Sequence, residues 1–163
     1  SFRATGKMVE YYLTIEQIKW NIVGDVYVTQ WAFNGQVPGP LLTATEGDIV
    51  RITVKNNTTI DHTIHPHGQW VPMVMDGVPN VTQLSVQPGE TFVYEFMAKP
   101  SGHMFYHCHV NAATTPALRL ITRSSLFTVR YIHPNSLALP VLTDFPFPSP
   151  PFPSPFSGLS AQC

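Results

Sequence analysis

Ile49-Val50-Arg51-Ile52-Thr53-Val54-Lys55 is the stretch that indicates the fold class most directly. Successive side chains of a strand point to opposite faces, so Val50, Ile52 and Val54 share one face and the polar residues between them share the other. An apolar face backed by a polar one is typical of a half-buried strand in a sandwich sheet. The stretch therefore predicts a β-protein with one covered face per sheet.

Similar short runs, rich in Val, Ile, Thr, Tyr and Phe, lie on both sides of this stretch and are separated by Gly, Pro and Asn. Helical periodicity is not convincing anywhere. The pattern predicts an all-β antiparallel sandwich or barrel. We expect strands over Val9–Trp20, Val26–Phe33, Asp48–Lys55, Thr82–Val86, Thr91–Met97 and His103–His107, with a further β-compatible run in Leu118–Ile132.

The composition changes near residue 133. Of the 16 prolines in the 163-residue chain, eight lie in 134–163, where Phe-Pro and Ser-Pro pairs recur. Proline cannot donate a backbone hydrogen bond and prefers the polyproline II conformation. We therefore expect one β-domain over 1–132 and an irregular Pro-rich tail over 133–163.

Charge and hydropathy exclude several classes of function. Only 12% of residues are charged, and nine Lys and Arg face ten Asp and Glu without a basic run, so a nucleic-acid partner is not expected. No apolar stretch approaches the ~20 residues needed to cross a bilayer, and the first residues lack the apolar core of a signal peptide. The sequence predicts a soluble chain without a membrane span.

Five of the seven histidines fall in two short motifs, His62-Thr63-Ile64-His65-Pro66-His67 and His107-Cys108-His109. On extended chain, residues two apart point the same way, so each His-x-His pair presents two imidazoles on one side. Cys108 then points to the opposite side, and the odd spacing of His62 from His65 sends its side chain to that side too. We expect two sites, back to back.

Two His-x-His pairs with an interposed cysteine indicate a metal site. A single such pair is more often a surface feature, and a lone buried cysteine is usually inert. A thiolate with imidazoles selects copper in an electron-transfer site that often adds an axial Met, whereas structural zinc favours Cys-x-x-Cys or longer His spacings. Asp76-Gly77 is first interpreted as a turn, the Met73 and Met75 pair as packing, and His103 and His133 as incidental.

Several ordered motifs together resemble the first domain of multicopper oxidases, closest to bacterial two-domain laccase-like proteins. The resemblance covers roughly residues 9 to 111. It rests on the two histidine motifs and on Phe33-Asn34-Gly35-Gln36-Val37-Pro38-Gly39-Pro40, Glu46-Gly47-Asp48, Met75-Asp76-Gly77-Val78, Val81-Thr82-Gln83 and Gln87-Pro88-Gly89-Glu90. It implies a cupredoxin-like Greek-key fold and copper as the cofactor.

The resemblance also implies a role for each candidate residue. His65, His67, His107 and His109 correspond to ligands of half a trinuclear type 2/type 3 copper cluster. His62 and Cys108 correspond to type 1 copper ligands, and Asp76 to an acid that assists proton supply.

Two departures from the family pattern bear on these roles. Relatives with a type 1 site in this domain carry a second His and a Met soon after the Cys, but 112–121 contain neither, so the type 1 site looks incomplete. The family cluster draws eight histidines from four His-x-His motifs, and this chain has two. It therefore needs further copies, a trimer by resemblance, or a missing second cupredoxin domain. The abrupt change after Asn111 suggests a frameshifted, rearranged or truncated gene.

The resemblance implies a periplasmic or secreted laccase-type oxidoreductase that oxidises phenolic or similar small donors and reduces dioxygen to water. Two other functions stay open. A single-domain copper-binding or electron-transfer protein, or an inactive fragment, would suit the missing second His and Met. A copper nitrite reductase has a similar fold but does not need histidines on both sides of the cysteine.

Overall fold

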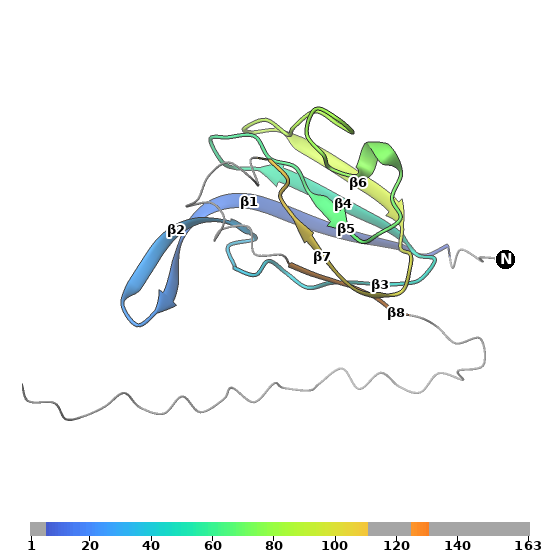
Figure 1. The fold of residues 1–163 in the computed structure, drawn as a ribbon, viewed down its shortest axis with the longest axis horizontal. Helices are drawn as coiled ribbons and strands as arrows, with labels where there is room; N and C mark the ends of the chain where they lie inside the picture. The colour runs from blue at the N-terminus through green and yellow to red at the C-terminus, as the bar shows by residue number, and fades with distance from the viewer. Residues whose placement is uncertain (1–5, 111–124, 131–163) are drawn as a thin grey trace, which may run out of the picture. The chain divides into compact units, whose positions relative to one another are not determined.

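The computed structural model describes residues 6–110 and 125–130. These residues form eight strands and one short 3-10 turn (Figure 1). The elements are β1 (Met8–Val23), β2 (Val26–Phe33), β3 (Leu42–Thr45), β4 (Ile49–Asn56), β5 (His65–His67), η1 (Met73–Met75), β6 (Thr91–Met97), β7 (Gly102–His107) and β8 (Ser125–Arg130). The predicted all-β class is confirmed.

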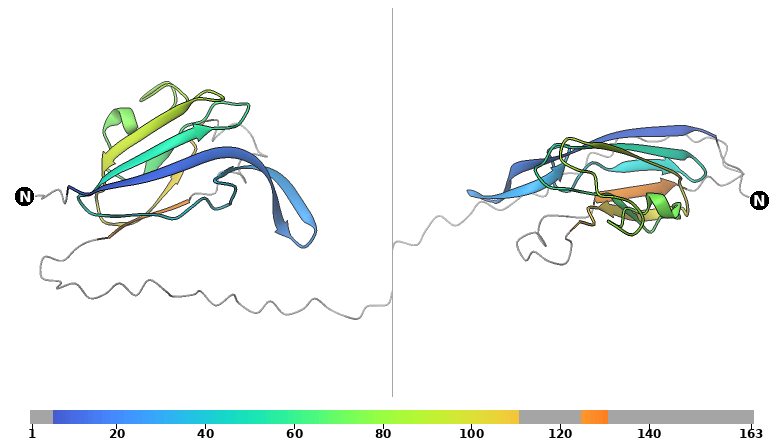
Figure 2. Two further views of the ribbon diagram at one scale, coloured as in Figure 1. Left: turned by 180° about the vertical axis from the view of Figure 1, so that it is seen from behind. Right: turned by 90° about the horizontal axis from the view of Figure 1, so that it is seen from above.

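The strands form two four-stranded sheets that face each other, one with the order β2-β1-β4-β6 and the other β3-β8-β7-β5 (Figure 2). The prediction that the sheets are antiparallel is wrong in part. Both sheets are mixed, because β1 runs parallel to β4 and β3 runs parallel to β8, while the other pairs are antiparallel. The first half of β1 pairs with β4 and its second half, from Ile15, pairs with β2. The β1–β2 hairpin therefore extends past β4.

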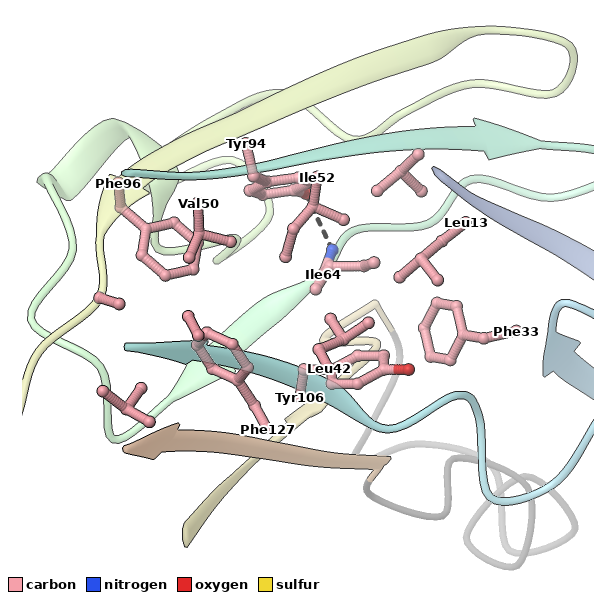
Figure 3. Close-up of a cluster of buried hydrophobic side chains, with 14 of the residues drawn as sticks. Leu13, Phe33, Leu42, Val50, Ile52, Ile64, Tyr94, Phe96, Tyr106 and Phe127 are labelled. Atoms are coloured by element: carbon pink, nitrogen blue, oxygen red, sulfur yellow. Dashed lines mark hydrogen bonds between the residues drawn. The ribbon is translucent and has the colours of Figure 1, made fainter. Parts of the chain in front are cut away.

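The core lies between the sheets and takes one face of each (Figure 3). Val50, Ile52 and Val54 of β4 are at most 1% exposed, as the alternation in that strand predicts. The buried amide of Ile64 donates a hydrogen bond of 2.8 Å to the hydroxyl of Tyr94 in the opposite sheet. This bond fixes the segment that leads into β5, which carries two of the candidate histidines.

Two strand predictions differ from the structure. The predicted strand over Thr82–Val86 is wrong, because the segment makes only isolated bridges, Pro79 with Gln83 and His62 with Val86. Its residues have the composition of a strand, but Leu84 is 79% exposed. Within residues 6–110 and 125–130, no strand pairs with this segment. Conversely β3 was not predicted, since its four residues are too few for a periodic pattern to be recognised.

Several expectations concern residues outside the described ranges. These are the Pro-rich tail over 133–163, the stretch 112–121 and the incidental role of His133. Of the β-compatible run in Leu118–Ile132, the described part contains β8.

Candidate metal centre

The four histidines of the two His-x-His pairs come together at one end of the β3-β8-β7-β5 sheet. Strand β5 pairs antiparallel with β7, with His65 opposite His107 and His67 opposite Phe105. Between them, Pro66 and Tyr106 are opposite each other and point into the core, where Tyr106 is 1% exposed. Burial of this pair obliges the histidines on either side to face outward.

The imidazoles form one contiguous group. The ring centroid of His65 lies 5.0 Å from that of His67, 5.3 Å from that of His107 and 5.3 Å from that of His109. His67 Nδ1 is 3.3 Å from His107 Nε2. One nitrogen each of His65, His67 and His107 lies within 4.8 Å of the others. The rings are thus close enough to share metal ions.

Asp76 and Gly77 hold the ring of His65. The backbone carbonyl of Asp76 accepts a hydrogen bond of 2.5 Å from His65 Nδ1, and its carboxylate Oδ1 is 3.5 Å from the same nitrogen. Gly77 has φ +76°, and a Cβ there would lie 1.9 Å from the carbonyl oxygen of Ile64. The turn therefore needs glycine at position 77. Because the turn places the Asp76 carbonyl on Nδ1 of His65, Nε2 of that ring is free to bind a metal.

His107 is oriented in the same way by a different backbone group. Its Nδ1 lies 2.9 Å from the carbonyl oxygen of Cys108, which accepts a hydrogen bond from it. Partial burial lowers the pKa of His107 from its ordinary value, and the neighbouring imidazoles of His65, His67 and His109 add to this effect. Both causes favour the neutral ring, which is the form that binds metals.

Behind the imidazole cluster, His62 and Cys108 meet on the core side. His62 Nδ1 lies 3.2 Å from Cys108 Sγ, and the two residues are 2% and 4% exposed. Burial lowers the pKa of His62 to about 4 and raises the pKa of the Cys108 thiol. His62 Nε2 is buried and has no hydrogen-bond partner among the described residues. The pair sits in a dry environment that opposes charge on either group.

This donor set suits copper. Ligand bonds to nitrogen and sulfur of about 2.0 to 2.3 Å place two donors of one ion roughly 3 to 4 Å apart, as His62 Nδ1 and Cys108 Sγ are. A buried thiol beside an imidazole is soft and shielded from water, as in blue copper sites. Among the outward imidazoles, Nδ1 of His65 and Nδ1 of His107 each donate to a backbone carbonyl, so Nε2 of each ring is available to a metal.

Two aromatic neighbours of the site were not predicted. Phe105 stacks on His67 at 4.3 Å between centroids, and Trp31 of β2 contacts His62. Phe105 is two residues before His107, so its place on the histidine side follows from strand alternation. No pattern in the sequence brings Trp31 to His62.

The remaining single residues have mixed outcomes. Met75 packs against the core as expected, whereas the packing interpretation of Met73 is wrong, since that side chain is 67% exposed. His103 is exposed and lies apart from the cluster, with Nδ1 3.1 Å from the hydroxyl of Thr128. Asp76-Gly77 is a turn, and the same turn brings Asp76 to His65.

Solved structures share this fold. The blue copper oxidase from Nitrosomonas europaea superimposes with a TM-score of 0.73 at 42% identity, over 78% of this chain and 40% of that chain. A multicopper oxidase from Pseudomonas thermotolerans superimposes with a TM-score of 0.72 at 32% identity, over 80% of this chain and 31% of that one. The fold is thus the cupredoxin fold of copper oxidases.

The sequence comparison defines the family. A family model described as multicopper oxidase matches residues 14–122. Dihydrogeodin oxidase from Aspergillus terreus is 46% identical over 113 residues, which are 64% of this chain and 18% of that protein. Laccase-2 from Botryotinia fuckeliana is 43% identical over 109 residues, with the same two coverages. The chain belongs to the multicopper oxidase family and spans about a fifth of the length of these relatives.

The described residues include no helix with the length and apolar character needed to cross a membrane.

Proposed function

We propose that this chain supplies half of the copper centre of a laccase-like oxidase, which oxidises phenolic or similar small donors by one electron and reduces dioxygen to water. The observation that carries the proposal is the arrangement around Cys108. Four imidazoles cluster on one side of strands β5 and β7, and the thiol meets a buried imidazole on the other. Family membership supports the same assignment.

Each copper-binding group has a defined origin. His65, His67, His107 and His109 are the proposed ligands of the shared cluster, and His62 and Cys108 those of the buried site. Copper bound at these positions would supply one-electron redox chemistry and a binding site for dioxygen. The protein contributes the spacing of the donors and the exclusion of water from the buried pair.

The chain provides a short covalent connection between the two sites. Cys108 is joined by one peptide bond to His107 and by another to His109, so one peptide unit and two side chains separate the sulfur from each imidazole. The carbonyl of Cys108 also accepts a hydrogen bond from His107 Nδ1. The thiol and the cluster are therefore linked both through the backbone and through this hydrogen bond.

Asp76 is the proposed proton donor and acceptor of the cluster. Its carboxylate is partly exposed and lies 3.5 Å from His65 Nδ1, so it connects the imidazole group with solvent. Reduction of dioxygen to water consumes protons at the cluster, and a carboxylate at this position can deliver them.

The imidazole cluster has to be completed by other histidines. His67 is exposed, and the family pattern needs twice the number of His-x-His motifs found here. We propose that a second cupredoxin domain, or further copies of this chain in a homo-oligomer such as a trimer, covers the cluster and supplies the rest. Dioxygen and a small electron donor are the other partners.

The test separates copper binding from oxidation. Purified chain is titrated with Cu²⁺ while the intense thiolate-to-copper absorption is recorded, and oxygen consumption is then measured with a phenol. We expect the absorption in the wild-type chain and its loss in Cys108→Ser. Oxygen consumption is expected only where light scattering shows an oligomer, or after addition of the second domain of a similar oxidase.

The outcomes separate the alternatives. Copper binding without the thiolate absorption would overturn the buried-site assignment and favour a colourless copper-binding protein. The absorption without oxygen consumption in any assembly would favour an electron carrier. Nitrite reduction that persists when His109 is replaced by Ala would favour a nitrite reductase.

A further inference from the structure

The backbone of His62 is fixed, but in the part of the chain that the structure describes the second nitrogen of its ring has no polar partner. His62 exchanges two backbone hydrogen bonds with Val86, of 3.1 and 2.8 Å. Nδ1 lies near Cys108 Sγ, and Nε2 is buried with no hydrogen bond. Metal-binding histidines usually donate from the second nitrogen to a carboxylate, carbonyl or water, which fixes the ring. No such group is recorded for His62 within the described residues.

The lack of a hydrogen bond at Nε2 matters because the imidazole ring can rotate by a half turn. Rotation about the bond between Cβ and the ring has broad, roughly two-fold preferences. A half turn would replace Nδ1 by a ring carbon opposite the sulfur, and the pair would no longer offer two donors to one ion. The weak hydrogen bond between Nδ1 and Cys108 Sγ, at 3.2 Å, favours the present orientation, and the groups that pack against the ring can add to this preference.

Trp31 packs against this ring. The centroids of the indole and the imidazole are 5.1 Å apart and their planes meet at 79°, an edge-to-face contact. Trp31 is fixed in turn, because it lies in β2 opposite Gln17 of β1 and packs against the core. Edge-to-face contacts of aromatic rings have a preferred geometry, and an imidazole N–H can donate weakly to an indole face.

We propose that Trp31 is a positioning residue that holds the imidazole of His62 with Nδ1 toward Cys108 Sγ. The indole takes the place of the hydrogen-bond acceptor that orients most metal-binding histidines. Trp31 binds no metal itself and acts only through His62. The inference deepens the proposed function and rests on it for the metal experiment, whereas the ring orientation is a property of the metal-free chain.

The first experiment uses metal-free protein. The ¹⁵N and ¹H resonances of the His62 ring are compared in wild type, Trp31→Leu and Trp70→Leu. Trp70 is the matched control, because it is 62% exposed and contacts Lys99 rather than His62. We expect one set of His62 ring resonances, shifted by the indole, in wild type and Trp70→Leu. Trp31→Leu should give two sets or exchange broadening. One unbroadened set with unchanged tautomer in Trp31→Leu overturns the proposal.

The second experiment uses Co²⁺, a redox-stable probe for the thiolate site. Trp31→Leu is expected to weaken the Co²⁺ affinity measured from the thiolate absorption by tenfold or more, while Trp31→Phe, which keeps a flat ring, retains most of it. Equal affinity in wild type and Trp31→Leu contradicts a positioning role. If wild type itself shows no thiolate absorption, the copper proposal fails at this site, and the resonance experiment alone decides the role of Trp31.

Circular dichroism establishes that each variant is folded. Should Trp31→Leu fail to fold, Trp31→Met fills much of the same volume without a flat ring and is subject to the same two comparisons.

Discussion

The two sides of the strand segment around Cys108 hold their imidazoles by opposite means. On the outer side, backbone carbonyls of Asp76 and Cys108 accept hydrogen bonds from His65 and His107. On the inner side, His62 is 2% exposed, and its ring meets sulfur and an indole instead of oxygen. One side relies on polar contacts near solvent, and the other on packing in a dry core.

The difference means that hydrogen bonds orient the outer imidazoles, whereas burial and packing orient the inner one. Hydrogen bonds to ring nitrogens select which nitrogen of an outer histidine is free, and partial exposure leaves those rings accessible from solvent. Burial keeps the inner pair uncharged and away from water, and a dry environment is also what tunes a thiolate copper site of the proposed kind. A change that acts on one side should therefore leave the other largely intact.

The largest expected effect comes from removing the sulfur. Cys108→Ser should abolish the thiolate-to-copper absorption and lower copper affinity at the inner site by at least a hundredfold, because serine does not supply a soft thiolate donor. The outer cluster should still bind copper. Isothermal titration combined with absorption measures both sites, and loss of copper binding at both would contradict their independence.

Gly77→Ala should disturb the outer imidazole cluster by displacing the backbone next to His65. The added Cβ would lie 1.9 Å from the Ile64 carbonyl oxygen, in a left-handed conformation, so we expect a loss of about 4 kcal/mol in the free energy of unfolding. Gly89→Ala is the control, since its φ is +80° with open space around it, and should cost only about 1 kcal/mol. Urea denaturation of the metal-free variants measures both values, and equal losses would refute the close-packing argument.

Acid should weaken the inner side of the metal-free chain. The pKa of His62 is lowered to about 4 when folded, so between pH 6.5 and 4 the unfolded chain binds the extra proton and stability falls as pH falls. The contribution is present above pH 6.5 and amounts to at most about 3 kcal/mol. His62→Leu should show a correspondingly shallower loss in urea denaturation at pH 7 and pH 4.5. Identical pH profiles would disprove this role.

The smallest effect is expected for Asp76→Asn. The carbonyl that holds His65 Nδ1 belongs to the backbone and is retained, so copper affinity at the outer cluster should fall by less than tenfold. In an assembled oxidase, the same variant should slow oxygen consumption more at high pH than at low pH, because protons are then scarce. A large loss of affinity would show that the carboxylate, rather than the carbonyl, orients the ring.

Strand alternation was enough to predict much of this arrangement. The period of two places the His-x-His pairs on one side and Cys108 on the other, and the structure has His62 beside Cys108 and the four imidazoles together. It could not predict contacts that depend on how the sheets pack. Trp31 lies in β2, whereas His62 lies outside the named strands, so strand alternation does not predict their contact.

The strand prediction over Thr82–Val86 shows the same limit. Its composition favours a strand, but a strand also needs a neighbour with free backbone groups, and here Gln83 and Val86 each form only an isolated bridge. The turn at Asp76 and Gly77 illustrates the converse case. The sequence indicated a turn, and the contact with Ile64 and His65 appears only in the folded chain.

The buried cross-strand pair of Pro66 and Tyr106 links the candidate metal centre to the alignment of β5 with β7. If β5 slid by one residue against β7, Pro66 would leave the core and an imidazole of β5 would enter it. Apolar burial thus penalises the misaligned chain before any ion is present. Copper uptake at the proposed centre would then report which molecules have folded in the correct alignment.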